Sequence, residues 1–180
     1  MIQSLESLHR AAQERGSRVL AVAAAQDAEV LLAVDAARKL GIATAILVGD
    51  EEQIRAIAQA HDIPLEPHRI LPEPDKVQAC RTAVKLVRDG QADAVMKGIV
   101  DTSIILKAVL DKEIGLRDAP VLSHVALFQV PGYDRLLYVT DAAMNIAPDL
   151  EAKKHIVSNA VKVAHALGNP NPIVACLCAV

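Results

Sequence analysis

Short apolar runs alternate with amphipathic segments through the first part of the chain. The runs at residues 18–25, 43–48 and 94–96 have the length and apolar character of buried strands. Around them, apolar residues recur three or four positions apart, a spacing typical of one face of a helix. That spacing predicts helices at residues 2–15, 27–41, 49–60, 75–90 and 101–110, and a short strand is expected at residues 68–70. Strands that alternate with helices form βαβ units, so the pattern predicts an α/β fold with a mostly parallel sheet and helices on both faces.

The pattern changes after the helix that begins near residue 101. Residues 122–130 and 136–140 are two apolar runs of strand character, and only a short Pro-Gly turn separates them. A short connection of this kind favours an antiparallel hairpin. A helix is then expected at residues 149–167, with Gly168 as its stop.

The last eight residues, IVACLCAV, carry no charged or hydrogen-bonding side chain other than the thiols. They are expected to form a strand that needs cover on both faces, with the helix at residues 149–167 packed on it. We assign residues 1–121 to a first α/β domain and residues 122–180 to the hairpin and the start of a second α/β domain. The second domain is expected to be incomplete here, so its last strand would lie at an exposed sheet edge or against another copy of the chain.

The composition argues against some classes of function. Hydrophobic residues make up 52% of the chain, but aromatic residues make up only 2%, which is few for stacking on nucleic-acid bases. The net charge of −3 provides no basic field for nucleic acid or an anionic membrane, and no apolar run approaches the roughly 20 residues of a membrane span. No signal peptide is recognised at the N-terminus, and Cys80, Cys176 and Cys178 are expected to be buried reduced thiols. Both features favour the cytoplasm.

The stretch at residues 92–107 carries the strongest signal for a binding site. Its strand ends at Lys97-Gly98, and after a short loop a helix opens at Asp101, Thr102 and Ser103. The helix start offers unpaired N–H groups and a positive dipole end, Gly98 allows close backbone approach, and Lys97 adds a charge. This arrangement suits phosphate or a phosphate group of coenzyme A (CoA). In the structural alternative, Asp101 or Thr102 only caps the helix and Lys97 is solvated.

The position of this stretch in the expected sheet supports a binding role. In open parallel sheets, ligands bind beyond the carboxyl ends of the strands. Lys97-Gly98 lies at such an end, and so do Asp27 and Asp50 after the two earlier strands. The first strand-to-helix turn lacks the Gly-rich fingerprint of dinucleotide-binding proteins, so a nicotinamide cofactor is not indicated.

Three segments together resemble a known family. They are ADAVMKGIVDTSIILKAVL at residues 92–110, LLYVTDAAMNIAPDLEAK at residues 136–153, and NAVKVAHALG at residues 159–168 with a proline-flanked apolar strand after it. Over most of its length the chain is similar to the phosphate butyryltransferases, within the wider family of phosphate acetyl/butyryl transferases. The resemblance implies two α/β domains with a cleft between them, as in isocitrate and isopropylmalate dehydrogenases. It also implies conversion of acyl-CoA and phosphate to acyl phosphate and CoA, without a redox cofactor.

The resemblance also implies which residues line the cleft. The substrate-binding set is Lys97, Gly98, Thr102 and Ser103, and the catalytic set is Asp141 and Asn145. Asp141 can orient a donor or assist proton transfer to the CoA sulfur, and its structural alternative is capping. Asn145 can position substrate, and its structural alternative is an Asx turn.

One departure from the family leaves two functions open. Family members are longer, and the segment with their Ser-Arg pair and a further Asp implicated in the chemistry has no counterpart here. The first function is a phosphate acyltransferase, which as this chain alone is expected to show little turnover. The second is a truncated or split non-catalytic chain that binds ligand or a partner chain. A dehydrogenase of the related fold is a weaker choice, because no nucleotide-binding loop and no metal-binding cluster of acids is visible.

The remaining expectations concern metals and partners. His124 is expected to be a core histidine, and His155 and His165 fall on different faces of one helix, which argues against a metal site. We expect no cofactor, acyl-CoA or CoA and phosphate as ligands, and no nucleic-acid or membrane partner. A homodimer or a higher homo-oligomer is expected.

Overall fold

The computed structural model describes residues 2–177 of the chain. It divides into two compact units, one formed by Ala12–Arg117 and the other by Met1–Ala11 together with Asp118–Val180. Helix α1, Leu5–Glu14, contributes residues to both units. The hydrophobic pattern gave no sign that the N-terminal residues group with the later part of the chain, and the domain division at residue 121 stays a prediction.

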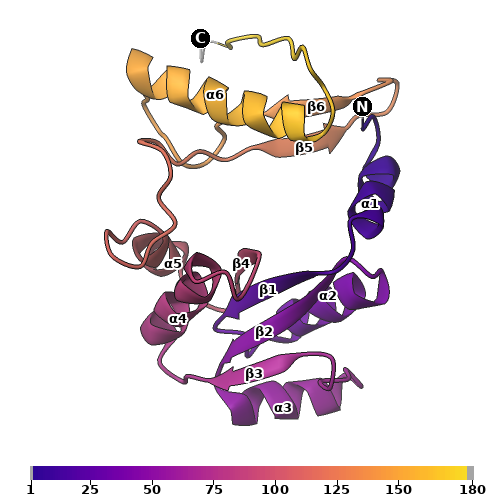
Figure 1. Ribbon diagram of the computed structural model, residues 1–180, viewed down its shortest axis with the longest axis vertical. Coiled ribbons are helices and arrows are strands. Elements are labelled where there is room, and N and C mark those ends of the chain that lie inside the picture. Colours follow the sequence, from indigo (N-terminus) through magenta and orange to yellow (C-terminus); the bar gives the residue numbers. More distant parts are fainter. Residues whose placement is uncertain (1, 178–180) are drawn as a thin grey trace. The chain divides into compact units, whose positions relative to one another are not determined.

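The first unit is built on a four-stranded parallel sheet (Figure 1). In chain order its elements are β1 Arg18–Ala23, α2 Ala28–Lys39, β2 Ala43–Gly49, α3 Glu51–Ala60, β3 Arg69–Pro72, α4 Lys76–Arg88, β4 Ala94–Lys97 and α5 Thr102–Val109. The strand order is β3-β2-β1-β4, and every neighbouring pair is parallel. The predicted α/β fold with a parallel sheet is therefore confirmed.

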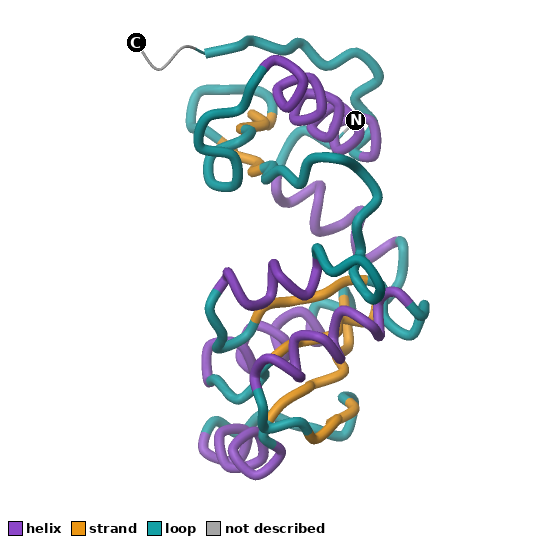
Figure 2. The backbone as a smooth tube through the Cα atoms, turned by 90° about the vertical axis from the view of Figure 1, so that its left-hand side faces the viewer, coloured by secondary structure: helices purple, strands orange, loops and turns teal. Residues whose placement is uncertain are grey.

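Helices cover both faces of this sheet, as predicted (Figure 2). Side chains of β1 alternate between the faces, because successive residues of a strand point to opposite sides. Ala21 and Ala23 pack with α4 and α5, whereas Val22 packs with α2 and α3. The core on both sides is aliphatic, and Leu31, Leu47, Ile54 and Val84 are among its fully buried side chains.

Aspartates begin the first three helices that follow a strand. Asp27, Asp50 and Asp75 are the N-cap residues of α2, α3 and α4, and each side chain accepts a backbone N–H three residues later. Such caps satisfy N–H groups that have no partner inside the helix. They place each helix start at the carboxyl edge of the sheet.

The second unit contains the predicted antiparallel hairpin. Strands β5, Ala126–Gln129, and β6, Leu136–Val139, pair antiparallel, and α6, Leu150–Ala166, follows with Asp149 as its N-cap. Strand β5 is shorter than the predicted run at residues 122–130, since residues 122–125 and 130 have no strand partner. Among residues 2–177, no helix combines the length and the apolar character that a membrane span requires.

The strand predicted at the end of the chain is wrong for the residues that the structure describes. Residues 173–177 have no strand conformation, and Ile173 and Leu177 are 91% and 93% exposed. A strand needs a neighbour for its backbone hydrogen bonds, and neither sheet of the described chain pairs with this segment. Cys176 is consequently exposed, whereas Cys80 is buried as expected. Residues 178–180, with Cys178, lie outside the described residues.

His68 is a buried titratable group beside β2. Its Nδ1 accepts the N–H of Ala45 at 3.1 Å, and its Nε2 is buried without a hydrogen-bond partner among the described residues. Burial lowers the pKa of His68, the charge of Arg38 lowers it further, and Asp35 acts in the opposite direction. The folded chain therefore resists protonation of this ring.

We expect the free energy of unfolding to fall as the pH drops below 6.5, the ordinary pKa of histidine. The reason is that the unfolded chain takes up a proton there, while folded His68 stays neutral until a lower pH. Urea unfolding at about pH 7.5 and about pH 5.5 measures this slope. The variant His68→Asn keeps an acceptor but does not titrate, so its slope should be flatter, and His61→Asn is the matched control at an exposed position. An equal slope in wild type and His68→Asn would contradict the assignment.

Candidate functional site

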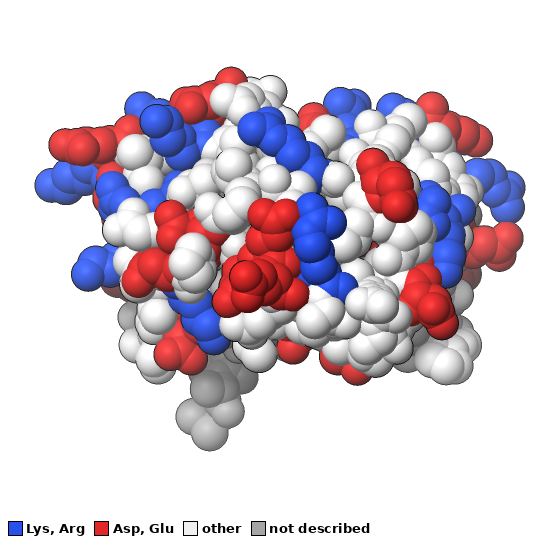
Figure 3. All heavy atoms as spheres, turned by 90° about the horizontal axis from the view of Figure 1, so that it is seen from below, with Lys and Arg blue, Asp and Glu red and all other residues white. Residues whose placement is uncertain are grey.

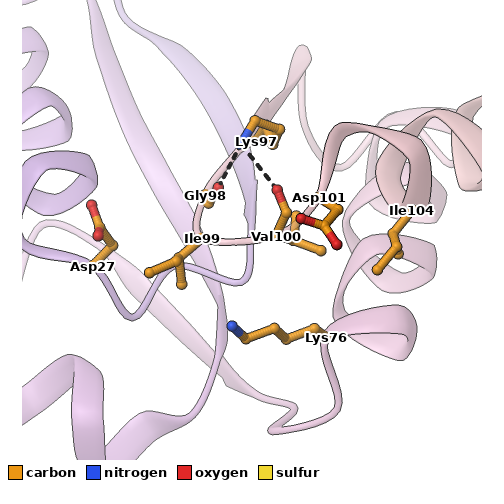
Figure 4. A pocket seen from close by; sticks show the side chains of 8 residues that line it. All are labelled: Asp27, Lys76, Lys97, Gly98, Ile99, Val100, Asp101 and Ile104. Atoms are coloured by element: carbon orange, nitrogen blue, oxygen red, sulfur yellow. Dashed lines mark hydrogen bonds between the residues drawn. The ribbon is translucent and has the colours of Figure 1, made fainter.

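A pocket of about 400 Å³ opens at the carboxyl edge of the parallel sheet (Figure 4). Its lining residues come from the β1–α2 loop, the start of α4, the β4–α5 loop and α5, and they are Asp27, Lys76, Lys97, Gly98, Ile99, Val100, Asp101 and Ile104. The volume falls in the range of about 300–1,000 Å³ that is usual for small-molecule sites. The predicted residues Lys97 and Gly98 line it, whereas Thr102 and Ser103 are not among its lining residues. Lys76 lines it too, although the sequence pattern does not point to that residue.

Backbone hydrogen bonds hold the β4–α5 loop against the end of β1. The N–H of Gly98 donates to the carbonyl of Ala23 at 2.8 Å, and the N–H of Ile99 donates to the carbonyl of Ala24 at 2.9 Å. Ala24 has a left-handed φ of 53°, a conformation that costs energy for a residue with a side chain. A Cβ on Gly98 would lie 2.2 Å from the carbonyl oxygen of Ala24, so glycine is required there by a neighbouring backbone.

Lys97 turns its ammonium group back onto its own loop. Its Nζ donates to the carbonyl of Gly98 at 3.2 Å and to the carbonyl of Val100 at 3.0 Å (Figure 4). Two of its three hydrogens are therefore used within the loop. Lys97 is exposed, as the structural alternative expects, but its ammonium group also has two acceptors in the protein.

The start of α5 differs from the other helix starts in this unit. Asp101 is its N-cap residue, but its side chain accepts no capping hydrogen bond. Among the described residues, no acceptor is placed on the N–H groups of Thr102 and Ser103. These donors lie at the positive end of the helix dipole, where an anion is stabilised.

The charges in and around the pocket are mixed. Two lysines, Lys76 and Lys97, and two aspartates, Asp27 and Asp101, line it. The carboxylate of Asp27 is already engaged, because it accepts the N–H of Val30 at 3.0 Å. On the face shown in Figure 3, acidic and basic side chains of the described residues are interspersed.

The predicted catalytic residues Asp141 and Asn145 contact each other in the second unit. The amide of Asn145 donates to one carboxylate oxygen of Asp141 and to the carbonyl of Leu122. The other oxygen of Asp141 accepts three backbone N–H groups, those of His124, Ala143 and Met144. Burial opposes ionisation of Asp141, but the hydrogen bonds from Asn145 and the three N–H groups outweigh it and lower the pKa of the carboxyl group.

Two other expectations about the second unit have different outcomes. His124 is exposed, so the prediction of a core histidine is wrong; it precedes β5, and its backbone contacts Thr140 and Asp141. The prediction that Asp141 or Asn145 shares a cleft with Lys97 stays a prediction, since the two groups belong to different units.

In the described part of the chain, no group of three or more His, Cys, Asp or Glu side chains is placed to hold a metal ion.

Comparisons with known proteins agree on one family. The model of the family described as phosphate acetyl/butaryl transferase matches residues 73–180. The chain is 47% identical over 180 residues to a phosphate butyryltransferase from Clostridium acetobutylicum, and 46% identical over the same length to one from Clostridium beijerinckii. Both matches cover 100% of this chain but only 60% of the relative.

A solved structure supports the same relationship. A branched-chain phosphotransacylase from Enterococcus faecalis V583 superposes with a TM-score of 0.70 and 30% identity. The match covers 84% of this chain and 52% of that protein. The chain therefore spans between half and two thirds of the length of these relatives.

Gly98→Ala should destabilise the first unit, because the added methyl group meets two backbone carbonyls of the β1 end. Overpacking of this kind costs about 1–3 kcal/mol in the free energy of unfolding. Urea unfolding provides the measurement, with Ile99→Ala, a truncation at the next and exposed position, as the control. A stability of Gly98→Ala equal to that of wild type would show that the loop is not held as described.

Asp141→Asn should loosen the second unit, because the new amide nitrogen cannot accept a hydrogen bond. The new nitrogen would replace one of the two carboxylate oxygens. It would therefore face either the side-chain amide of Asn145 or the three backbone N–H groups of His124, Ala143 and Met144. These groups are exposed or half-buried, so each lost hydrogen bond costs about 0.5–1.5 kcal/mol. The measurement is the protection of the N–H groups of Ala143 and Met144 against hydrogen exchange. Asn145→Ala, which leaves the three N–H contacts intact, is the control, and unchanged protection in Asp141→Asn would refute this role.

Proposed function

Because the chain belongs to the phosphate acetyl/butyryl transferase family, we propose that it functions in phosphate acyl transfer. The reaction exchanges CoA and phosphate between acyl-CoA and acyl phosphate. The observation that carries the proposal is the 47% identity to a phosphate butyryltransferase over all 180 residues. Since only 60% of that relative is covered, the activity and the substrates of the whole protein are part of the proposal.

The pocket supplies what the first step of this reaction needs. An oxygen of phosphate attacks the thioester carbonyl, the carbon–sulfur bond breaks, and CoA leaves as a thiol after taking up a proton. Phosphate must therefore be desolvated and held beside the thioester, and such positioning lowers the barrier by several kcal/mol. We assign this holding to the site at the β4–α5 loop, where the N–H groups of Thr102 and Ser103 are open and where Lys97 and Gly98 shape the backbone beside the pocket.

Asp141 and Asn145 are assigned to the catalytic part of the proposal. The carboxylate of Asp141 accepts four hydrogen bonds and has a lowered pKa, so it is ionised at neutral pH. An ionised and saturated carboxylate is a poor proton donor, which favours the orienting role for Asp141. Asn145, held by Asp141 and by the carbonyl of Leu122, is the residue that would position substrate.

The finer properties of the protein are proposed from the same family relationship. The substrates are acyl-CoA or CoA and phosphate, and the length of the acyl group is left open between acetyl, butyryl and longer chains. A cytoplasmic location agrees with the free thiols of Cys80 and Cys176. A homo-oligomer that works without a cofactor is proposed from the family relationship alone.

A second candidate function keeps ligand binding but lacks turnover. Within the described residues, the second unit buries only three apolar side chains, Leu136, Ile156 and Ala164, and it exposes others such as Ile146 and Ile173. So small a core favours a chain that needs a partner chain for a complete second domain. In this case the chain binds ligand or a partner and does not itself catalyse transfer.

The test follows phosphate-dependent release of CoA thiol and formation of acyl phosphate from butyryl-CoA or acetyl-CoA. The assay compares the chain alone with the chain plus the part of the Clostridium acetobutylicum relative outside the matched region. Equal amounts of thiol and acyl phosphate in either sample support the transferase. Binding of CoA and phosphate with no transfer in both samples supports the non-catalytic function. Thiol release without acyl phosphate indicates hydrolysis and contradicts the proposal.

A further inference from the structure

We propose that Lys76 contacts the phosphate group of the ligand, and that Lys97 is a positioning residue for the β4–α5 loop. The inference rests on the proposed function and divides the roles of two lysines that line the same pocket. The ligand is phosphate-bearing, and its source is either inorganic phosphate or a phosphate group of CoA.

The ammonium group of Lys97, although exposed, already has two acceptors in its own loop. It bonds the carbonyls of Gly98 and Val100, while the N–H of Ile99 between them bonds the end of β1. These three contacts fix consecutive peptide groups of the loop and so define where α5 begins. A phosphate on Lys97 would compete with two carbonyl oxygens for the ammonium hydrogens, and the loop would lose its clamp.

The ammonium group of Lys76, in contrast, has no acceptor among the described residues. Lys76 is the first residue of α4, and the cap of that helix is made by Asp75 and the N–H of Gln78, without the Lys76 side chain. Among residues 2–177, no hydrogen bond or ion pair is formed by its ammonium group, so all three hydrogens are available. Figure 4 shows the side chain extending along the pocket, with its charged end on the side of Ile99 and Asp27.

Lys76 is exposed, and its place in the pocket distinguishes it from the other exposed lysine of α4, Lys85. Lys76 shares a pocket of about 400 Å³ with the loop that leads to the open N–H groups of α5. Neither carboxylate in the pocket pairs with the ammonium group of Lys76. Asp27 accepts the N–H of Val30, and Asp101 forms no ion pair among the described residues. Lys85, on the same helix, is exposed and does not line the pocket, so it provides a matched control.

The experiment measures binding of CoA and of inorganic phosphate to the 180-residue chain by calorimetry, and the exchange of the N–H groups of residues 98–104 by NMR. The variants are Lys76→Met, Lys97→Met and Lys85→Met. Lys76→Met should weaken binding about tenfold or more, the effect of losing one charge-assisted hydrogen bond, with loop exchange unchanged. Lys97→Met should speed exchange of the loop N–H groups in the ligand-free chain, and Lys97→Arg should restore part of their protection. Lys85→Met should match wild type.

The outcomes separate this inference from the proposed function. Wild type that binds neither CoA nor phosphate overturns the inference, and it overturns the proposed function as well when neither sample of the transfer assay forms acyl phosphate. Wild type that binds, with Lys76→Met binding equally well, overturns the inference and leaves the proposed function standing. The inference is also overturned, and the proposed function again left standing, if Lys97→Met abolishes binding while the exchange of the loop N–H groups stays as in wild type. A loss of affinity in Lys76→Met for phosphate alone, or for CoA alone, identifies the source of the phosphate group.

Discussion

The first unit depends on the contact between the β4–α5 loop and the end of β1. Two backbone hydrogen bonds make this contact, and they require a left-handed Ala24 and a residue without Cβ at Gly98. The strain at Ala24 is tolerated because its carbonyl gains the N–H of Ile99, and because the neighbouring strands of the sheet fix the backbone around it. The direction of the loop, the clamp by Lys97 and the start of α5 follow from this contact. A binding pocket placed on such a backbone scaffold is organised before any ligand arrives.

Much of the first unit could be predicted because its signals are local. The alternation of apolar runs with helical spacing is enough to specify a parallel sheet covered on both faces, and Asp27, Asp50 and Asp75 each mark a helix start. The same reasoning brought Lys97 and Gly98 to the pocket, since they follow a strand. The sequence does not point to Lys76, because it comes directly after the N-cap residue Asp75 and lies off the apolar face of the helix, as a surface residue does. It also comes just after the carboxyl end of β3, so the rule about strand ends, applied to that weak strand, would have found it.

The wrong predictions concern segments whose structure depends on distant partners. IVACLCAV has the composition of a buried strand, but composition supplies no neighbour, and residues 173–177 pair with neither sheet. The apolar residues around His124 in the sequence favour a place in the core. In the structure it precedes β5, and its backbone is used to bind Asp141 and Thr140 while the residue is exposed. In both cases hydrophobicity gave the tendency to be buried but not the surface against which burial takes place.

The two sets of site residues are organised by different physical means. The pocket of the first unit is held by backbone groups, with the ammonium of Lys97 closing the loop. In the second unit a side chain is the centre, because the carboxylate of Asp141 gathers three backbone N–H groups and the amide of Asn145. Had Asp141 served as a proton-transfer group, its lone pairs would have to be released from these donors at each turnover, at a cost of several hydrogen bonds. A fixed negative charge that orients Asn145 requires no such rearrangement. Because both side-chain N–H groups of Asn145 are used on Asp141 and Leu122, the amide oxygen is the atom left to position substrate.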